Sequence, residues 1–98
     1  MNGDELRRAR RRLGLSRVEL ALILNVADTT VYRWEKSDVA RIDPLQHELV
    51  LLLVGISASP EASTYGDALV DALREGPTFA LHILLQIAYG DWRPNHAA

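Results

Sequence analysis

Apolar residues recur at helical spacing along most of the chain, and this pattern predicts an all-α fold. Polar or glycine-containing breaks divide it into helices at about residues 4–13, 16–24, 28–35, 43–54, 63–75 and 78–89, caps included. Gly14 and Gly55 are the expected ends of the first and fourth of these helices. Asp43-Pro44 reads as an N-cap followed by a first-turn proline. We therefore expect a five- to six-helix bundle.

The 21 residues from Leu15 to Glu35 predict two short helices joined by a tight turn. Ser16 can cap the first helix, and Glu19 completes a capping box. Asn25 favours a left-handed ending, after which Asp28 or Thr29 is expected to cap the second helix. The residues expected to face inward are Val18, Leu20, Ala21, Ile23, Leu24, Val31 and Trp34. Those expected to face outward are Asp28, Thr29, Tyr32, Arg33 and Lys36.

This stretch resembles the helix-turn-helix of the lambdoid phage repressors and Cro proteins, the Xre-like regulators. Their pattern runs roughly L-S-Q-x-E-L-A-x-x-L-G-V-S-x-x-T-[IV]-x-x-W-E, and the chain follows it without a gap. The matching positions are Leu15, Ser16, Glu19, Leu20, Ala21, Leu24, Val26, Thr30, Val31, Trp34 and Glu35. The chain departs from the pattern at Arg17 (usually Gln), Asn25 (usually Gly) and Ala27 (usually Ser or Thr). The resemblance covers roughly residues 4–55.

The resemblance implies a protein that binds double-stranded DNA with the second helix of the motif in the major groove. Base contacts then fall to Asp28, Thr29 and Arg33, and Arg33 can pair bidentately with guanine. The expected phosphate contacts are Arg10, Arg17, Thr30, Tyr32, Lys36 and Arg41. The family often pairs an arginine of its first helix with the glutamate that ends the motif. Arg10 and Glu35 occupy those positions, so we expect them to form an ion pair.

The net charge of −2 hides an uneven distribution along the chain. Residues 1–42 contain nine Lys/Arg and six Asp/Glu, a sum of +3, whereas residues 43–98 contain two and seven, a sum of −5. Release of counterions from DNA favours a basic surface at the phosphates. We therefore expect the first half to touch DNA and the acidic half to have another task. The basic run at residues 7–12 is either part of the contact surface or a solvated helix face.

The predicted helix at 78–89 is apolar on nearly all sides, interrupted only by His82 and Gln86. A chain of 98 residues offers little protein to surround such a helix, which suggests that a second copy covers part of it. A palindromic operator also requires a homodimer, with two recognition helices about one DNA turn apart. The expected interface residues are Leu73, Phe79, Ile83, Leu84 and Ile87. The alternative is that the last three helices only pack on one another and on the motif.

These patterns suggest a DNA-binding part at residues 1–55 and a dimerisation or interaction extension at 56–98, which can also pack as one domain. The chain has no cysteine, its charged start does not resemble a signal peptide, and its apolar runs are too short to span a bilayer. We expect a cytoplasmic protein with no membrane partner. No histidine pair has metal-site spacing and no phosphate loop or nucleophile context occurs, so we expect no enzyme, metal or cofactor.

Three functions fit the sequence. The first is a homodimeric, sequence-specific transcriptional regulator, most simply a repressor, as the resemblance implies. The second is an antitoxin that binds a toxin partner through its acidic half and represses its own operon. The third is a protein-interaction module whose motif no longer binds DNA, because the carboxylate of Asp28 at the head of the recognition helix repels phosphate.

Overall fold

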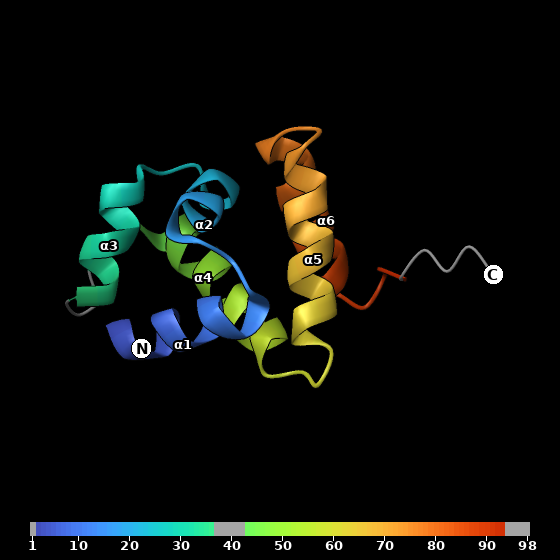
Figure 1. Ribbon diagram of the computed structural model, residues 1–98, viewed down its shortest axis with the longest axis horizontal. Coiled ribbons are helices and arrows are strands. Elements are labelled where there is room, and N and C mark those ends of the chain that lie inside the picture. Colours follow the sequence, from blue (N-terminus) through green and yellow to red (C-terminus); the bar gives the residue numbers. More distant parts are fainter. Residues whose placement is uncertain (1, 37–42, 94–98) are drawn as a thin grey trace.

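The computed structural model describes residues 2–36 and 43–93, which form six helices. They are α1 (Gly3–Leu13), α2 (Arg17–Leu24), α3 (Asp28–Lys36), α4 (Pro44–Ser57), α5 (Ala62–Leu73) and α6 (Pro77–Ala88). Figure 1 shows α3 at one end of the molecule and the antiparallel pair α5–α6 at the other, with α1, α2 and α4 between them. The expected all-α bundle is confirmed.

The predicted caps of the first two helices are present. Gly14 follows α1 in the left-handed region with φ of 74°. Ser16 Oγ accepts a hydrogen bond from the Glu19 amide at 3.0 Å, and Glu19 Oε1 accepts one from the Ser16 amide at 2.8 Å. Asn25 ends α2 with φ of 59° and ψ of 47°. The capping box and the left-handed asparagine are thus both confirmed.

Several helix boundaries differ from the sequence prediction by one to three residues. Asp28 is already the first residue of α3, and the Ala27 carbonyl accepts from the Thr30 amide at 3.0 Å, so neither Asp28 nor Thr29 is the cap. Helix α4 passes through Gly55 and ends at Ser57. A Cβ atom added to Gly55 would meet no other atom within 4 Å. The last two helices begin one or two residues earlier than expected, α5 at Ala62 and α6 at Pro77, a residue well suited to a first turn.

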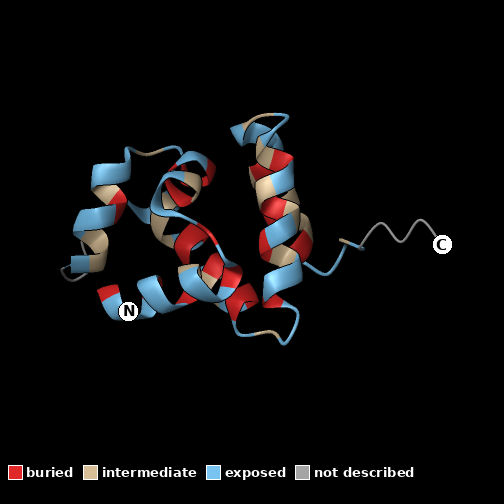
Figure 2. Cartoon of the chain, in the orientation of Figure 1, coloured by how far each residue is buried: buried red, intermediate tan, exposed pale blue. Residues whose placement is uncertain are grey.

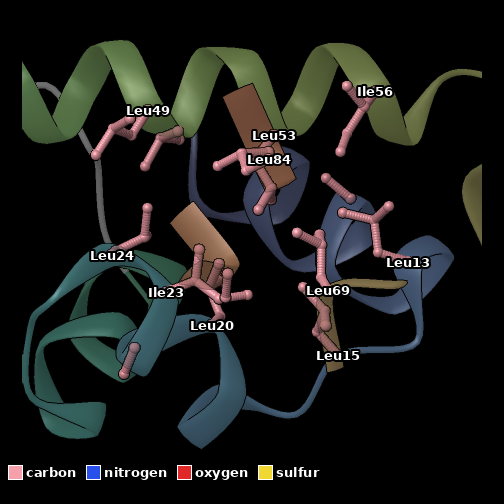
Figure 3. Packing of buried hydrophobic residues seen from close by; sticks show 14 of the residues in the cluster. Leu13, Leu15, Leu20, Ile23, Leu24, Leu49, Leu53, Ile56, Leu69 and Leu84 are labelled. Carbon is pink, nitrogen blue, oxygen red and sulfur yellow. The ribbon is translucent and has the colours of Figure 1, made fainter. Parts of the chain in front are cut away.

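One continuous apolar core joins all the helices, and Figure 3 shows part of it. Its fully buried side chains come from both halves of the chain: Leu6, Leu13, Leu20, Ile23, Leu24, Val31, Val50, Leu53, Leu69 and Leu84. Residues from 56 onward therefore complete the same core as the residues before them. Val18 is an exception to the predicted inward stripe, because 53% of its surface is exposed.

Helices α1 and α5 meet at a point where a side chain cannot fit. Gly66 is buried in α5, and a Cβ atom added to it would overlap the backbone carbonyl of Leu13 at the end of α1. The backbones of the two helices can therefore approach each other only because residue 66 is glycine. This contact fixes α5 against the first four helices.

The burial of α6 corrects part of the predicted dimer interface. Leu84 is fully buried and Ile87 is buried, so both belong to the subunit's own core and present no surface to a partner. Leu73 and Ile83 are half-buried, and Phe79 is exposed. The polar pair His82 and Gln86 lies exposed on α6, with a ring nitrogen and the amide nitrogen 3.2 Å apart. In the part of the chain that the structure describes, no helix is long and apolar enough to cross a membrane.

Candidate nucleic-acid interface

Helix α3 presents one polar face to solvent at the end of the molecule farthest from α5–α6 (Figures 1 and 2). Val31 is fully buried and Trp34 half-buried, and both anchor the helix on α1 and α2. The side chains left exposed are Asp28, Thr29, Tyr32, Arg33 and Lys36, as the sequence predicted. They share one face because residues three and four apart lie above one another on a helix. The face is therefore open to solvent along the length of the helix.

An ion pair ties the last turn of α3 to α1. Arg10 Nε lies 2.6 Å from Glu35 Oε2, and Arg10 Nη2 lies 3.1 Å from Oε1. The remaining nitrogen, Nη1, donates to the Leu15 carbonyl at 3.0 Å. Only 13% of the Arg10 side chain and 6% of the Glu35 side chain are exposed. The predicted Arg10–Glu35 pair is therefore confirmed, and it also reaches the chain segment that leads into α2.

A close backbone contact reinforces the same junction. Gly3, the first residue of α1, is buried against the carbonyl groups of Trp34 and Glu35. A Cβ atom at residue 3 would overlap the Glu35 carbonyl. The beginning of α1 therefore packs closely on the end of α3, and the end of α1 packs closely on α5.

A basic groove of about 340 Å³ runs beside the exposed face of α3. Helices α1, α2 and α3 line it with Arg7, Arg10, Arg11, Arg17, Tyr32, Glu35 and Lys36. The ring of Tyr32 lies near two of the cations, with the guanidinium carbon of Arg17 4.8 Å and Nζ of Lys36 5.5 Å from its centre. These contacts hold the cations at the mouth of the groove. A groove with four exposed cations suits a chain of phosphates.

Arg7 and Arg11 are contact candidates that the sequence reading did not assign individually. Arg7 lies three residues before Arg10 and four before Arg11, so the three arginines lie on one side of α1. Arg8 and Arg12 lie on another side of the helix, beside Val54, Ser57 and Ala58. The basic run 7–12 is therefore divided. One part lines the groove, and the other faces the end of α4. The spacing of three and four residues after Arg7 was the sequence signal that could have separated the two sets of arginines.

The remaining predicted contacts have mixed positions. Thr29 and Arg33 lie on the exposed face of α3 one turn apart, with Asp28 in its first turn. Thr30 is half-buried beside this face. Arg17 is the first residue of α2 and lines the basic groove. Arg41 lies outside the described residues. Within the described ranges, no three His, Asp or Glu side chains are placed to hold a metal ion.

Comparison with known proteins gives one match. Residues 6–53 match the protein-family model described as Helix-turn-helix. No curated protein and no solved structure matches the chain. The matched segment begins in α1 and ends within α4, so it contains every residue of the basic groove and of the exposed α3 face. It leaves α5 and α6 outside.

Proposed function

Residues 6–53 form a helix-turn-helix of the Xre/Cro-like family of DNA-binding regulators, and on that premise we propose that the chain recognises a specific DNA sequence by placing α3 in the major groove. Binding over a promoter would exclude other proteins from it, which makes a repressor the simplest regulator of this kind. The first turns of the recognition helix carry the base contacts in such complexes.

The observation that carries this proposal is the continuity of two surfaces. The exposed face of α3 adjoins the groove that holds Arg7, Arg11, Arg17 and Lys36, and Tyr32 belongs to both. Phosphate contacts set the register of a protein on the duplex, and base contacts supply the specificity. Here the two kinds of contact side chain lie side by side on one end of the molecule.

The exposed side chains of α3 offer chemistry for reading bases. The guanidinium of Arg33 can donate to guanine O6 and N7, and the Thr29 hydroxyl and methyl lie one turn earlier on the same face. Asp28 can accept from the amino group of cytosine, and in the first turn of α3 it also stabilises the helix dipole. The carboxylate therefore has a structural role that does not conflict with DNA binding.

A homodimer on a palindromic operator is the assembly that this proposal includes. Helices α5 and α6 lie at the far end from α3, so a contact between copies there leaves both recognition surfaces exposed (Figure 1). Two half-sites bound together gain affinity over one because the second contact is intramolecular.

A gel shift of the purified protein against DNA from its own upstream region tests the function. We expect a complex that survives a large excess of random DNA, and footprinting should locate a two-fold related site. The matched control is Thr29→Ala with Arg33→Ala, which should retain random-sequence binding and lose the preference. Equal affinity for upstream and random DNA with the unmodified protein would contradict sequence-specific recognition. No complex with either DNA would favour the protein-interaction module whose motif no longer binds DNA.

An antitoxin is the second candidate, supported by the acidic surface of α5. Asp67 and Asp71 of α5, and Glu75 two residues after its end, are exposed and follow one another at four-residue spacing, so they form a stripe outside the matched segment. Such a stripe can neutralise a basic toxin surface. Co-expression with a protein encoded beside this chain tests it. A stable complex that relieves growth arrest would favour the antitoxin, and an intact growth arrest would remove it.

A further inference from the structure

We propose that a groove between α5 and α6 is the surface through which two copies of this chain associate, with Phe79 of each copy entering the groove of the other. The biological role of this dimer rests on the proposed operator binding. The groove itself does not, because its lining residues lie outside the DNA-binding end of the molecule. The groove has a volume of about 510 Å³, and its lining comes from α5, from the connection between α5 and α6, from α6, and from Trp92 and Arg93 beyond it, with none from α1–α4.

The groove has an apolar interior with a small floor and large walls. Ala68 and Ala72 of α5 leave the space, and Phe79, Ile83 and Trp92 border it. Trp92 is held in place by an edge-to-face contact with Tyr65, with ring centres 5.6 Å apart at 81°. Its amide also donates to the Gln86 carbonyl at 3.1 Å. The wall is therefore formed before any partner arrives, which lowers the entropy cost of association.

Phe79 and the groove together make the surface self-complementary. The Phe79 side chain is 41% exposed, although it borders an apolar hollow that lies on the same face. A two-fold axis places the same patch of both copies in contact, so a projecting side chain and a hollow on one face can each be filled by the other copy. Two phenylalanines and two hollows would then be buried by a single symmetric contact.

The charges around the groove favour a second copy over a basic partner. Asp71 and Glu75 supply two negative charges, and Arg74 and Arg93 supply two positive ones, so the rim is neutral. All four side chains are exposed. Within one copy Arg74 Nη1 already lies 3.6 Å from Asp71 Oδ1, so in a two-fold contact Glu75 of one copy can face Arg93 of the other. A cationic protein would meet two arginines at this rim, beside the same two acids.

Sedimentation equilibrium of the full chain tests the inference. We expect a dimer at micromolar concentration, and a dissociation constant raised by about tenfold to a hundredfold in Phe79→Ser, because one large apolar side chain leaves the interface. Ala68→Arg should act similarly by filling the hollow. The matched control is Leu45→Ser, which removes an exposed leucine of α4 outside the groove and should leave the dimer intact. Circular dichroism must show that each variant keeps its helices.

Charge exchange supplies an independent arm. The double variants Asp71→Arg/Glu75→Arg and Arg74→Glu/Arg93→Glu carry rims of one sign, so each alone should be monomeric and a mixture should form heterodimers. Adding Phe79→Ser to both should weaken the heterodimer, which excludes plain attraction between unlike proteins.

An unmodified chain that stays monomeric at 100 μM, on the order of the weakest useful assembly, would overturn the inference. If that monomer still prefers its operator half-site, the proposed function stands. A dimer that binds operator and random DNA equally would support the inference and contradict the proposed function.

Discussion

The guanidinium of Arg10 in α1 donates two hydrogen bonds, of 2.6 and 3.1 Å, to the carboxylate of Glu35 in the last turn of α3. The same arginine borders the basic groove, so one residue both braces the recognition helix and faces the place where a phosphate would lie. Arginine suits this double task because its planar fork can bond a carboxylate along one edge and keep a further donor for another group.

Removing either partner of this pair should destabilise the fold. We expect Arg10→Met or Glu35→Leu to lower the free energy of unfolding by roughly 3 kcal/mol, because each leaves a mostly buried charge unpaired. The double variant should recover much of the loss, since no isolated charge remains. Urea unfolding followed by circular dichroism measures all three. If the double variant is as unstable as the sum of the single ones, the ion pair is not the cause.

Arg33→Ala should relax sequence preference more than it weakens general DNA binding. A bidentate arginine–guanine contact is worth about 1–3 kcal/mol of discrimination, which is lost when the fork is removed. Competition gel shifts with operator and random duplexes measure the ratio. An equal loss of affinity for both duplexes would place Arg33 at the phosphates, and an unchanged affinity would place it outside the interface.

The residues that line the basic groove should set the salt dependence of binding. Replacing Arg7, Arg11, Arg17 or Lys36 by Ala should reduce the slope of log K against log salt by about one unit each, on specific and random DNA alike. Arg8→Ala and Arg12→Ala are the matched controls, because these arginines belong to the same helix and face α4. A slope that falls equally for both sets would show that only the overall charge of α1 matters.

Two glycine-to-alanine substitutions should change stability in opposite directions. Gly66→Ala forces a methyl group onto the Leu13 carbonyl, so we expect a loss of about 1–3 kcal/mol as α5 is displaced. Gly55→Ala adds a methyl group in open space within α4, where alanine is a better helix former, so we expect a gain of about 0.5–1 kcal/mol. Thermal unfolding of both variants measures the difference. A stable Gly66→Ala protein would contradict the tight packing of α1 on α5.

Local signals in the sequence predicted the motif well because capping is chemistry within a few residues. Ser16, Glu19 and Asn25 adopt the expected roles, since their partners lie within one turn of helix. The Arg10–Glu35 contact spans 25 residues and could be expected only from the family resemblance. Arg41 lies outside the described residues, so its expected phosphate contact stays a prediction.

Where a helix is apolar on several sides, periodicity does not say which side meets which neighbour. Helix α2 has eight residues, and its Val18 is exposed although the sequence pattern does not distinguish it from Leu20 and Leu24. The same ambiguity assigned Leu84 and Ile87 to a partner, whereas α2, α4 and α5 cover them within the subunit. The spacing within the basic run separates Arg7, Arg10 and Arg11 from Arg8 and Arg12, but only the packing of α1 shows which of these two sets borders α3.

Helices α3 and α5–α6 lie at opposite ends of the molecule (Figure 1), and this placement has a consequence for the layout of the operator if copies join through the groove of α5 and α6. Copies joined through the groove carry their recognition helices at the outer ends of the pair. The molecule is 44 Å long, and α3 and α5–α6 lie towards opposite ends of this longest axis, so a pair joined end to end holds its recognition helices farther apart than one such length. One turn of B-DNA, about 34–36 Å, is too short for this span, and two turns accommodate it. The half-sites should therefore lie about 20 base pairs apart, with bare duplex at the centre, and inserting five base pairs there should rotate one half-site to the far side of the DNA.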